Sequence, residues 1–134
     1  MSFVLDASVT VVWAMPDEAD PEADYALDIT TRNGAIVPSI WWYEIRNILV
    51  VNERRGRITP AKTAQFIVEL ADLNIRVFPA EWHRDLPALA RQYQLTIYDA
   101  AYLDLAMRNH LPLATLDRAL KAAALAAGVP LLKS

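Results

Sequence analysis

Short apolar runs alternate with longer helix-forming stretches along this chain of 134 residues. Because the runs are short and mostly apolar, we expect buried strands at residues 3–5, 35–38, 75–79, 111–115 and 129–132. The segments between them carry helical periodicity or helix-end signals, and the expected helices cover residues 7–13, 21–31, 39–54, 59–73, 81–93, 95–110 and 117–127. Buried strands that alternate with helices form a parallel sheet covered on both faces. The sequence therefore predicts a single α/β domain over residues 1–134.

Several helix ends are marked by residues with special backbone roles. Ser39 and Thr59 are the expected N-caps of their helices, and Pro60 suits the first turn after Thr59. Gly56 and Gly128 follow the last periodic residues of two helices, where a left-handed residue commonly ends the helix.

The composition excludes several classes of function. A hydrophobic content of 54% supports a substantial core. The absence of cysteine excludes disulfides, thiolate zinc sites and cysteine nucleophiles, and it is typical of a cytoplasmic protein. Two histidines are too few for a histidine-rich metal site. The net charge of −3 argues against a general nucleic-acid coat, but an enzyme with an acidic site remains compatible with it.

Neither a membrane anchor nor a secretion signal is indicated. The longest apolar runs are too short to span a bilayer. The N-terminal residues MSFVLDAS contain no basic region and no cleavage pattern. We therefore expect a cytoplasmic location and no membrane partner.

One acid lies on a helix face that otherwise faces the core. In residues 95–110, a helical period places six side chains on one stripe: Leu95, Asp99, Tyr102, Leu103, Ala106 and His110. An acid on such a stripe is costly unless a hydrogen bond, a cation or a metal compensates it. A capping box is the alternative, with Thr96 as N-cap and Asp99 at the third helical position. Asp104 lies on the opposite face with Arg108 four residues later, so we expect an exposed ion pair there.

Three further acids are expected near the same edge of the sheet. Asp6 follows the first strand directly, and Asp117 follows the fourth strand after Thr115 and Leu116. Glu44 lies in the second turn of the helix that begins after the second strand, on a stripe with Ile40, Trp41, Asn47, Ile48 and Val51. Ligands of such folds bind beyond the carboxyl ends of the strands. Taken singly, Asp117 has an alternative as a helix cap and Asp6 as a turn residue, so the combination carries the signal.

Four carboxylates in one pocket require a compensating positive charge, because repulsion and burial would otherwise raise their pKa values. Oxygen ligands favour hard cations such as Mg²⁺ or Mn²⁺. A site of this kind activates water for attack on phosphorus. The acids therefore point to metal-dependent hydrolysis of phosphodiester bonds.

Four segments carry a resemblance to a known family and occur in the order of that family: VLDASV, YEIRNIL, YDAAYLDLA and ATLDRAL. Through them the chain resembles the PIN domain, and specifically the VapC-type toxins of toxin–antitoxin modules. The resemblance covers essentially the whole chain. It implies a three-layer α/β/α fold whose five-stranded parallel sheet has the order 3-2-1-4-5. It also implies a Mg²⁺- or Mn²⁺-dependent endoribonuclease that a VapB-type antitoxin neutralises. A homodimer, or a higher toxin–antitoxin assembly, is expected on the same basis.

The resemblance also implies roles for the four acids. Asp6 and Asp99 match direct metal ligands, and Asp117 matches a residue that binds metal directly or through water. Glu44 matches a position that binds a second metal or orients the attacking water.

Three polar residues match supporting positions of the family. Ser8 and Thr115 match small hydroxyl residues that support the metal shell. Asn47 matches a position that orients Glu44.

Basic and aromatic residues near the Glu44 helix are candidates for contacts with partners. The favoured interpretation of Arg54, Arg55 and Arg57 is a solvated rim at the helix end, and contact with RNA phosphates is the alternative. Arg46 is a further candidate for contact with RNA, with simple exposure as its alternative. Trp41 and Trp42 are adjacent on one helix and point in different directions, so we expect Trp42 to be partly exposed. The resemblance implies that this face contributes to a dimer contact or to an antitoxin groove.

Two other functions remain open at the level of the sequence. One is a PIN-like nuclease outside a toxin system, which acts on DNA or in RNA processing. The other is a PIN-like domain that only binds, although such a module has little need of four acids.

Overall fold

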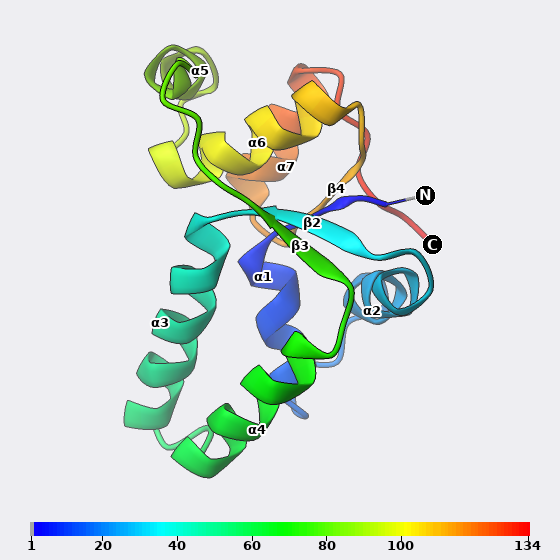
Figure 1. Cartoon of the computed structure of the whole chain (residues 1–134), viewed down its shortest axis with the longest axis vertical. Helices are drawn as coiled ribbons and strands as arrows, with labels where there is room; N and C mark the ends of the chain where they lie inside the picture. Colours follow the sequence, from blue (N-terminus) through cyan, green and yellow to red (C-terminus); the bar gives the residue numbers. More distant parts are fainter. Residues whose placement is uncertain (1) are drawn as a thin grey trace.

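The computed structural model describes residues 2–134 and follows the predicted alternation of strands and helices (Figure 1). The elements are, in order, β1 (Val4–Leu5), α1 (Ala7–Thr10), η1 (Val11–Ala14), α2 (Pro21–Asn33), β2 (Ala35–Pro38), α3 (Ile40–Arg54), α4 (Pro60–Ala71), β3 (Ile75–Phe78), α5 (Leu86–Tyr93), α6 (Ile97–Asn109), β4 (Leu113–Ala114) and α7 (Arg118–Ala126). All strand pairs are parallel, and the sheet has the order β3-β2-β1-β4.

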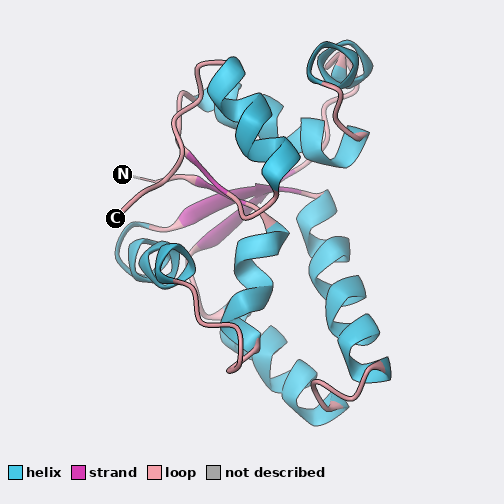
Figure 2. Cartoon of the chain, turned by 180° about the vertical axis from the view of Figure 1, so that it is seen from behind, coloured by secondary structure: helices cyan, strands magenta, loops and turns pink. Residues whose placement is uncertain are grey.

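The helices form a layer on each side of the sheet. Helices α6 and α7 lie on one side, with α5 packed against α6, while α1 to α4 lie on the other side (Figures 1 and 2). Helices α3 and α4 pair with each other and extend away from the sheet as a helical arm (Figure 2). No helix within residues 2–134 is long and apolar enough to cross a membrane. The three-layer α/β class is confirmed.

The prediction of a fifth strand at residues 129–132 is wrong. This segment lies beside β4, but it makes a single parallel bridge, between Leu113 and Leu131. Leu113 donates its N–H to the carbonyl of Pro130, and Leu132 donates to the carbonyl of Leu113, both at 2.9 Å. Because β4 has only two residues and Pro130 has no N–H to donate, the ladder is not extended. The sheet therefore has four strands in the order 3-2-1-4.

The middle of the sheet is fully buried and its edge is not. In β1 and β2 all residues are buried, and Val4 pairs with both Ile36 and Leu113. In β3 the residues Arg76 and Val77 are exposed, although the sequence predicted a buried strand. β3 lies at the edge of the sheet and has a neighbour on one side only, which explains the difference. The site-bearing strand β1 is thus held between two neighbours.

Two predicted helix starts need correction. The helix predicted over residues 81–93 begins only at Leu86, because Asp85 caps it through the N–H of Ala88 and Pro87 occupies the first turn. Ser39 stands at the N-cap of α3, but its backbone is already helical and its side chain makes no capping bond. Thr59 caps α4 as predicted, through the N–H of Lys62 at 3.2 Å.

Candidate active site

Asp6 is the central acid of the site, because it follows β1 in the middle of the sheet. Its side chain is almost fully buried, and its Oδ2 atom accepts two hydrogen bonds. Ser8 Oγ donates from 2.6 Å, and Thr115 Oγ1, which follows β4, donates from 2.7 Å. Burial raises the pKa of Asp6 and the charge of Asp117 adds to the rise, while the two hydroxyl groups oppose it. Ser8 and Thr115 thus contact Asp6 directly, and their support of a metal shell stays a prediction.

The same hydroxyl groups join the loop after β1 to the loop after β4. Ser8 Oγ accepts from the N–H of Leu116 at 2.9 Å, and Thr115 Oγ1 accepts from the N–H of Asp117 at 3.0 Å. The two oxygens lie 3.3 Å apart. This network fixes the backbone of Asp117 relative to the carboxylate of Asp6.

Asp117 is both a helix cap and a member of the acidic group. Its Oδ2 atom accepts from the N–H of Leu120 at 2.8 Å, which makes it the N-cap of α7. The capping alternative is therefore confirmed. It does not remove Asp117 from the site, because the charge of Asp117 raises the pKa values of Asp6 and Asp99.

Asp99 is half-buried in the first turn of α6. Thr96 caps this helix through the N–H of Asp99 at 3.1 Å. The reciprocal half of a capping box is missing, since the Asp99 carboxylate accepts no hydrogen bond from any residue that the structure describes. Burial raises the pKa of Asp99 to about 6, with further contributions from the charges of Asp117 and Asp6. Capping thus explains Thr96 and leaves the carboxylate of Asp99 without a structural role.

Glu44 is held by a residue that the sequence analysis placed only in the core. Tyr102 is fully buried, and its hydroxyl donates to Glu44 Oε1 at 2.6 Å. Burial raises the pKa of Glu44, and the charges of Asp6 and Asp99 add to the rise, whereas the bond from Tyr102 opposes it. The signal for this pair was present in the sequence, because a buried tyrosine hydroxyl needs a partner and an inward-facing acid needs a donor.

Asn47 does not orient Glu44, contrary to the prediction. Its side chain is exposed, and it makes no hydrogen bond to Glu44 within residues 2–134. The predicted stripe on this helix is rotated relative to the buried one, whose members are Trp41, Ile45, Leu49 and Asn52. Glu44 therefore lies at the flank of the buried face, and Asn47 lies outside it.

The four acids belong to one electrostatic group at the carboxyl edge of the sheet, as the pKa effects among Asp6, Glu44, Asp99 and Asp117 show. Among residues 2–134, however, no three Asp, Glu, His or Cys side chains already form a cluster that could hold a metal ion. Glu44 is bonded to Tyr102, and Asp117 is bonded to its own helix. The donors fit a hard divalent cation by chemistry, because they are all carboxylates and repel one another in its absence.

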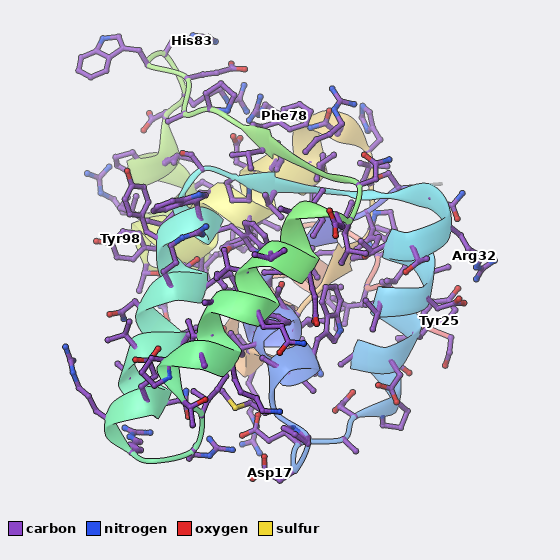
Figure 3. The ribbon with its side chains drawn as sticks, turned by 60° about the horizontal axis from the view of Figure 1, so that its bottom comes forward. Asp17, Tyr25, Arg32, Phe78, His83 and Tyr98 are labelled. Atoms are coloured by element: carbon purple, nitrogen blue, oxygen red, sulfur yellow. The ribbon has the colours of Figure 1, made fainter. Side chains whose placement is uncertain are left out.

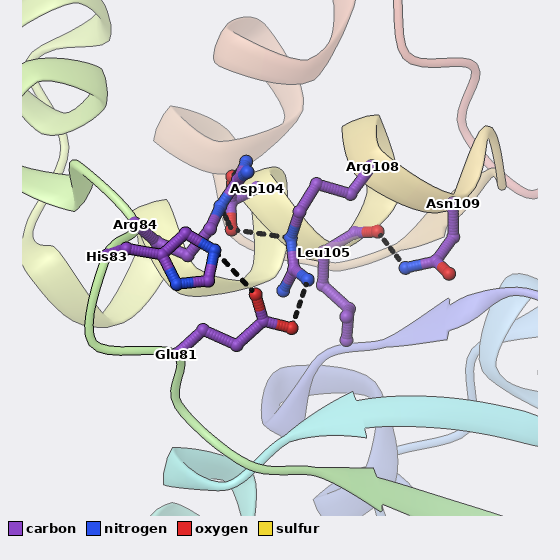
Figure 4. Close-up of polar contacts among 7 residues, drawn as sticks. All are labelled: Glu81, His83, Arg84, Asp104, Leu105, Arg108 and Asn109. Carbon is purple, nitrogen blue, oxygen red and sulfur yellow. Dashed lines mark hydrogen bonds and ion pairs between the residues drawn. The ribbon is translucent and has the colours of Figure 1, made fainter.

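Asp104, which was expected on the surface, is instead buried in an ion-pair network (Figure 4). The predicted pair with Arg108 is confirmed, with 2.9 Å between Arg108 Nε and Asp104 Oδ2. Arg84 pairs with the same carboxylate, and Arg108 also reaches Glu81 at 3.1 Å. The predicted exposure is wrong because the loop between β3 and α5 covers this face of α6 (Figure 4). A cavity of about 240 Å³ lies beside this network and is lined by none of the four site acids.

The candidate partner residues lie along the arm formed by α3 and α4. Trp42 is 45% exposed, and the guanidinium carbon of Arg46 lies 3.5 Å from the centre of its ring. Arg54 and Arg55 are exposed at the end of α3. Arg57 pairs with Glu18 at 2.6 Å and with Asp17 at 3.4 Å, so its charge is largely compensated.

The end of this arm is far from the acidic edge. α3 has 15 residues, and at about 1.5 Å per residue it spans roughly 20 Å. Asp17, which contacts Arg57, and Tyr98, which precedes Asp99, are accordingly well separated (Figure 3). Contact of Arg54, Arg55 and Arg57 with RNA stays a prediction, and it requires a substrate that extends along the arm.

Comparison with known proteins identifies the relatives of this chain. It is 32% identical over 124 residues to Ribonuclease VapC3 of Pyrobaculum aerophilum, over 90% of this chain and 92% of that protein. The crystal structure of PAE2754 from Pyrobaculum aerophilum matches with a TM-score of 0.71 and 26% identity, over 92% of this chain and 87% of that chain.

Two more distant structures share the fold. FitAcB from Neisseria gonorrhoeae matches with a TM-score of 0.59 at 18% identity, over 99% of this chain and 97% of that chain. A toxin–antitoxin complex from Klebsiella pneumoniae matches with a TM-score of 0.57 at 18% identity, over 86% of each chain. The model of the PIN domain matches residues 3–125. The chain therefore belongs to the PIN domain family and is a homologue of a VapC ribonuclease.

Proposed function

We propose that this protein is a Mg²⁺- or Mn²⁺-dependent endoribonuclease and the toxin of a toxin–antitoxin pair. The observation that carries the proposal is the group of four acids at the carboxyl edge of the sheet: the charge of Asp117 raises the pKa values of Asp6 and Asp99, and the charges of Asp6 and Asp99 raise that of Glu44. Membership of the PIN domain family and the similarity to a VapC ribonuclease support it. Such a group of acids is costly for a module that only binds, because burial and repulsion disfavour the charged forms of Asp6, Glu44 and Asp99.

Each of the four acids has its own proposed role. Asp6 and Asp99 are the proposed direct ligands of the metal, and Asp117 contributes directly or through water. Glu44 takes a second metal or orients the attacking water. A bound divalent cation lowers the pKa of water and stabilises the negative charge that develops on the phosphate. Ser8 and Thr115 would keep the carboxylate of Asp6 fixed throughout the reaction.

The surface around Trp42 is the proposed antitoxin contact. A groove of about 200 Å³ runs beside it, between α3, α4 and the edge strand β3, and its walls are mostly apolar. Trp42 and Arg46 form one side of the groove and Ile67 and Val77 lie on the other. Large aromatic and arginine side chains of this kind often dominate binding energies at protein interfaces. A VapB-type antitoxin is the proposed occupant, and a homodimer and a cytoplasmic location stay predictions.

Cleavage of a mixed RNA pool tests the proposed activity. Wild-type protein, Asp6→Asn and Asp99→Asn are purified identically and incubated with Mn²⁺, with Mg²⁺ and with EDTA. We expect discrete fragments from the wild type with metal and none from either variant or with EDTA. Equal cleavage by all three proteins would identify a contaminating ribonuclease. Absence of both cleavage and metal binding by calorimetry in the wild type would favour a module that only binds.

The same preparations separate a toxin from a nuclease of another kind. Cleavage of single-stranded DNA at the rate of RNA would favour a general PIN-like nuclease. Expression of the wild type should arrest growth, and co-expression of the protein encoded by a neighbouring small gene should restore it. Trp42→Ala should weaken that rescue if the groove beside Trp42 binds the antitoxin.

A further inference from the structure

Tyr102 makes the one side-chain hydrogen bond between α3 and α6 among the residues that the structure describes. It is fully buried, and it lies on α6 three residues after Asp99. Its hydroxyl reaches across to Glu44 on α3 at 2.6 Å. One turn of α6 therefore carries both an acid of the site and the donor that contacts another acid of the site.

The surroundings of Glu44 favour a turn of its carboxylate toward solvent when the bond from Tyr102 is absent. A glutamate side chain loses rotamer freedom when it is fixed, which is a free-energy cost. Glu44 lies at the flank of the buried face of α3, where a turn toward solvent would restore that freedom. Asp6 and Asp99 also repel its charge. Without a donor on the protein side, both effects would move the carboxylate away from the sheet edge.

We propose that Tyr102 is a positioning residue, which holds the carboxylate of Glu44 at the acidic edge by occupying its Oε1 atom. Oε2 is then the oxygen of Glu44 that is directed to a metal or to the attacking water. This inference rests on the proposed nuclease function for its activity readout only, since the placement of Glu44 is measurable without metal or RNA.

The test compares Tyr102→Phe with a matched loss of a buried hydroxyl elsewhere. Tyr102→Phe should reduce the affinity for Mn²⁺ or the kcat for RNA cleavage about tenfold or more, with little change in KM. Losses of this size are typical when a residue that orients a metal ligand is removed. Thr30→Val is the control, because Thr30 is fully buried in α2 and its hydroxyl donates only to the carbonyl of Ala26 at 2.8 Å. It should lower the Tm and leave Mn²⁺ affinity and kcat unchanged.

A double-mutant cycle tests whether Tyr102 acts through Glu44. In the Glu44→Ala background, Tyr102→Phe should cause no further loss of Mn²⁺ affinity. Wild-type affinity and kcat in Tyr102→Phe, or the same loss in both backgrounds, would overturn the proposal.

Failure of the proposed function is distinguishable from failure of this inference. If the wild type neither binds Mn²⁺ nor cleaves RNA, crystal structures of the metal-free wild type and of Tyr102→Phe decide the question. A Glu44 carboxylate that turns to solvent in the variant supports positioning by Tyr102. A Glu44 carboxylate that stays in place without the hydroxyl refutes it.

Discussion

The replacement Asp99→Asn should stabilise the metal-free protein although it removes a proposed metal ligand. The carboxylate of Asp99 accepts no hydrogen bond within residues 2–134, so its charge is repelled by Asp6 and Asp117 without a compensating contact. Asparagine has nearly the same size and carries no charge. The amide thus relieves both the repulsion and the cost of burying an anion.

The size of the stabilisation by Asp99→Asn follows from the pKa of Asp99. The pKa of Asp99 is raised from 3.8 to about 6, and each unit corresponds to about 1.4 kcal/mol, which sets a ceiling of about 3 kcal/mol. Because Asp99 is only half-buried, solvent screening reduces this to roughly 1.5 kcal/mol. The loss of a negative charge in the first turn of α6 costs about 0.5 kcal/mol. The net gain is about 1 kcal/mol, or roughly 4 °C in Tm.

The sign of the pH dependence is fixed by the same shift. The folded protein binds the proton of Asp99 more tightly than the unfolded chain does, so wild-type stability falls as the pH rises from about 4 through about 6. The variant lacks this fall. In EDTA, the difference in Tm between Asp99→Asn and the wild type should therefore be near zero at about pH 4 and full at about pH 8.

Thermal unfolding with and without Mn²⁺ is the assay. In EDTA at high pH the variant should unfold at the higher temperature. Saturating Mn²⁺ should reverse the order, because a ligand at a hundred times its Kd adds about 2.7 kcal/mol to the protein that binds it. A variant that is less stable than the wild type in EDTA, or a difference that does not change with pH, would refute the electrostatic explanation of Asp99.

Four other substitutions test separate features of the structure. Asp104→Asn should lower the free energy of unfolding by about 2 kcal/mol in a urea titration, opposite in sign to Asp99→Asn, because Arg84 loses its paired acid and Arg108 keeps only Glu81. Thr115→Val removes one of the two hydroxyl donors of Asp6 and should weaken Mn²⁺ binding about tenfold by calorimetry. Gly34→Ala should cost about 2 kcal/mol or more, since φ is +84° and the new Cβ would lie 2.9 Å from a backbone oxygen before β3. Gly128→Ala, with φ of +75° and nothing within 4 Å, should cost only about 1 kcal/mol.

The position of Asp6 at the carboxyl end of β1 could be predicted because it depends only on adjacent residues in the sequence. A run of apolar residues that ends in an acid places that acid at the carboxyl end of a buried strand. The order of the strands was supplied by the resemblance, since apolar runs do not say which strands are neighbours. The fifth strand predicted at residues 129–132 was wrong for a similar reason. An apolar run indicates burial, whereas a strand also needs a neighbouring strand that is long enough to pair with it.

Asp104 was misplaced because helical periodicity assumes a single covered face. α6 is covered on one face by the sheet and on the other by the loop before α5. Arg84 reaches Asp104 from that loop, 20 residues earlier in the chain. No spacing within the helix reports such a contact.

The partner of Glu44 was missed for a related reason. Tyr102 is 58 residues away in the sequence, and the contact depends on how α3 and α6 are placed across the sheet edge. The periodic pattern identified each residue as inward-facing but did not pair them. Asn47 was assigned as the partner from the family resemblance. The buried stripe on α3 is rotated relative to the predicted one, which leaves Asn47 exposed.

Helix capping and membership of an acidic site were treated as alternatives for Asp99 and Asp117, and the fold explains why they are not. In a parallel sheet covered by helices, each helix that follows a strand begins at the carboxyl edge, where its first N–H groups need acceptors. Acids that cap such helices and acids that bind ligands are therefore drawn to the same place. Asp117 does cap α7, and its charge still acts on Asp6 and Asp99. A capping motif at this edge thus carries no weight against a functional role, and the convergence of acids from separate segments is the observation that decides.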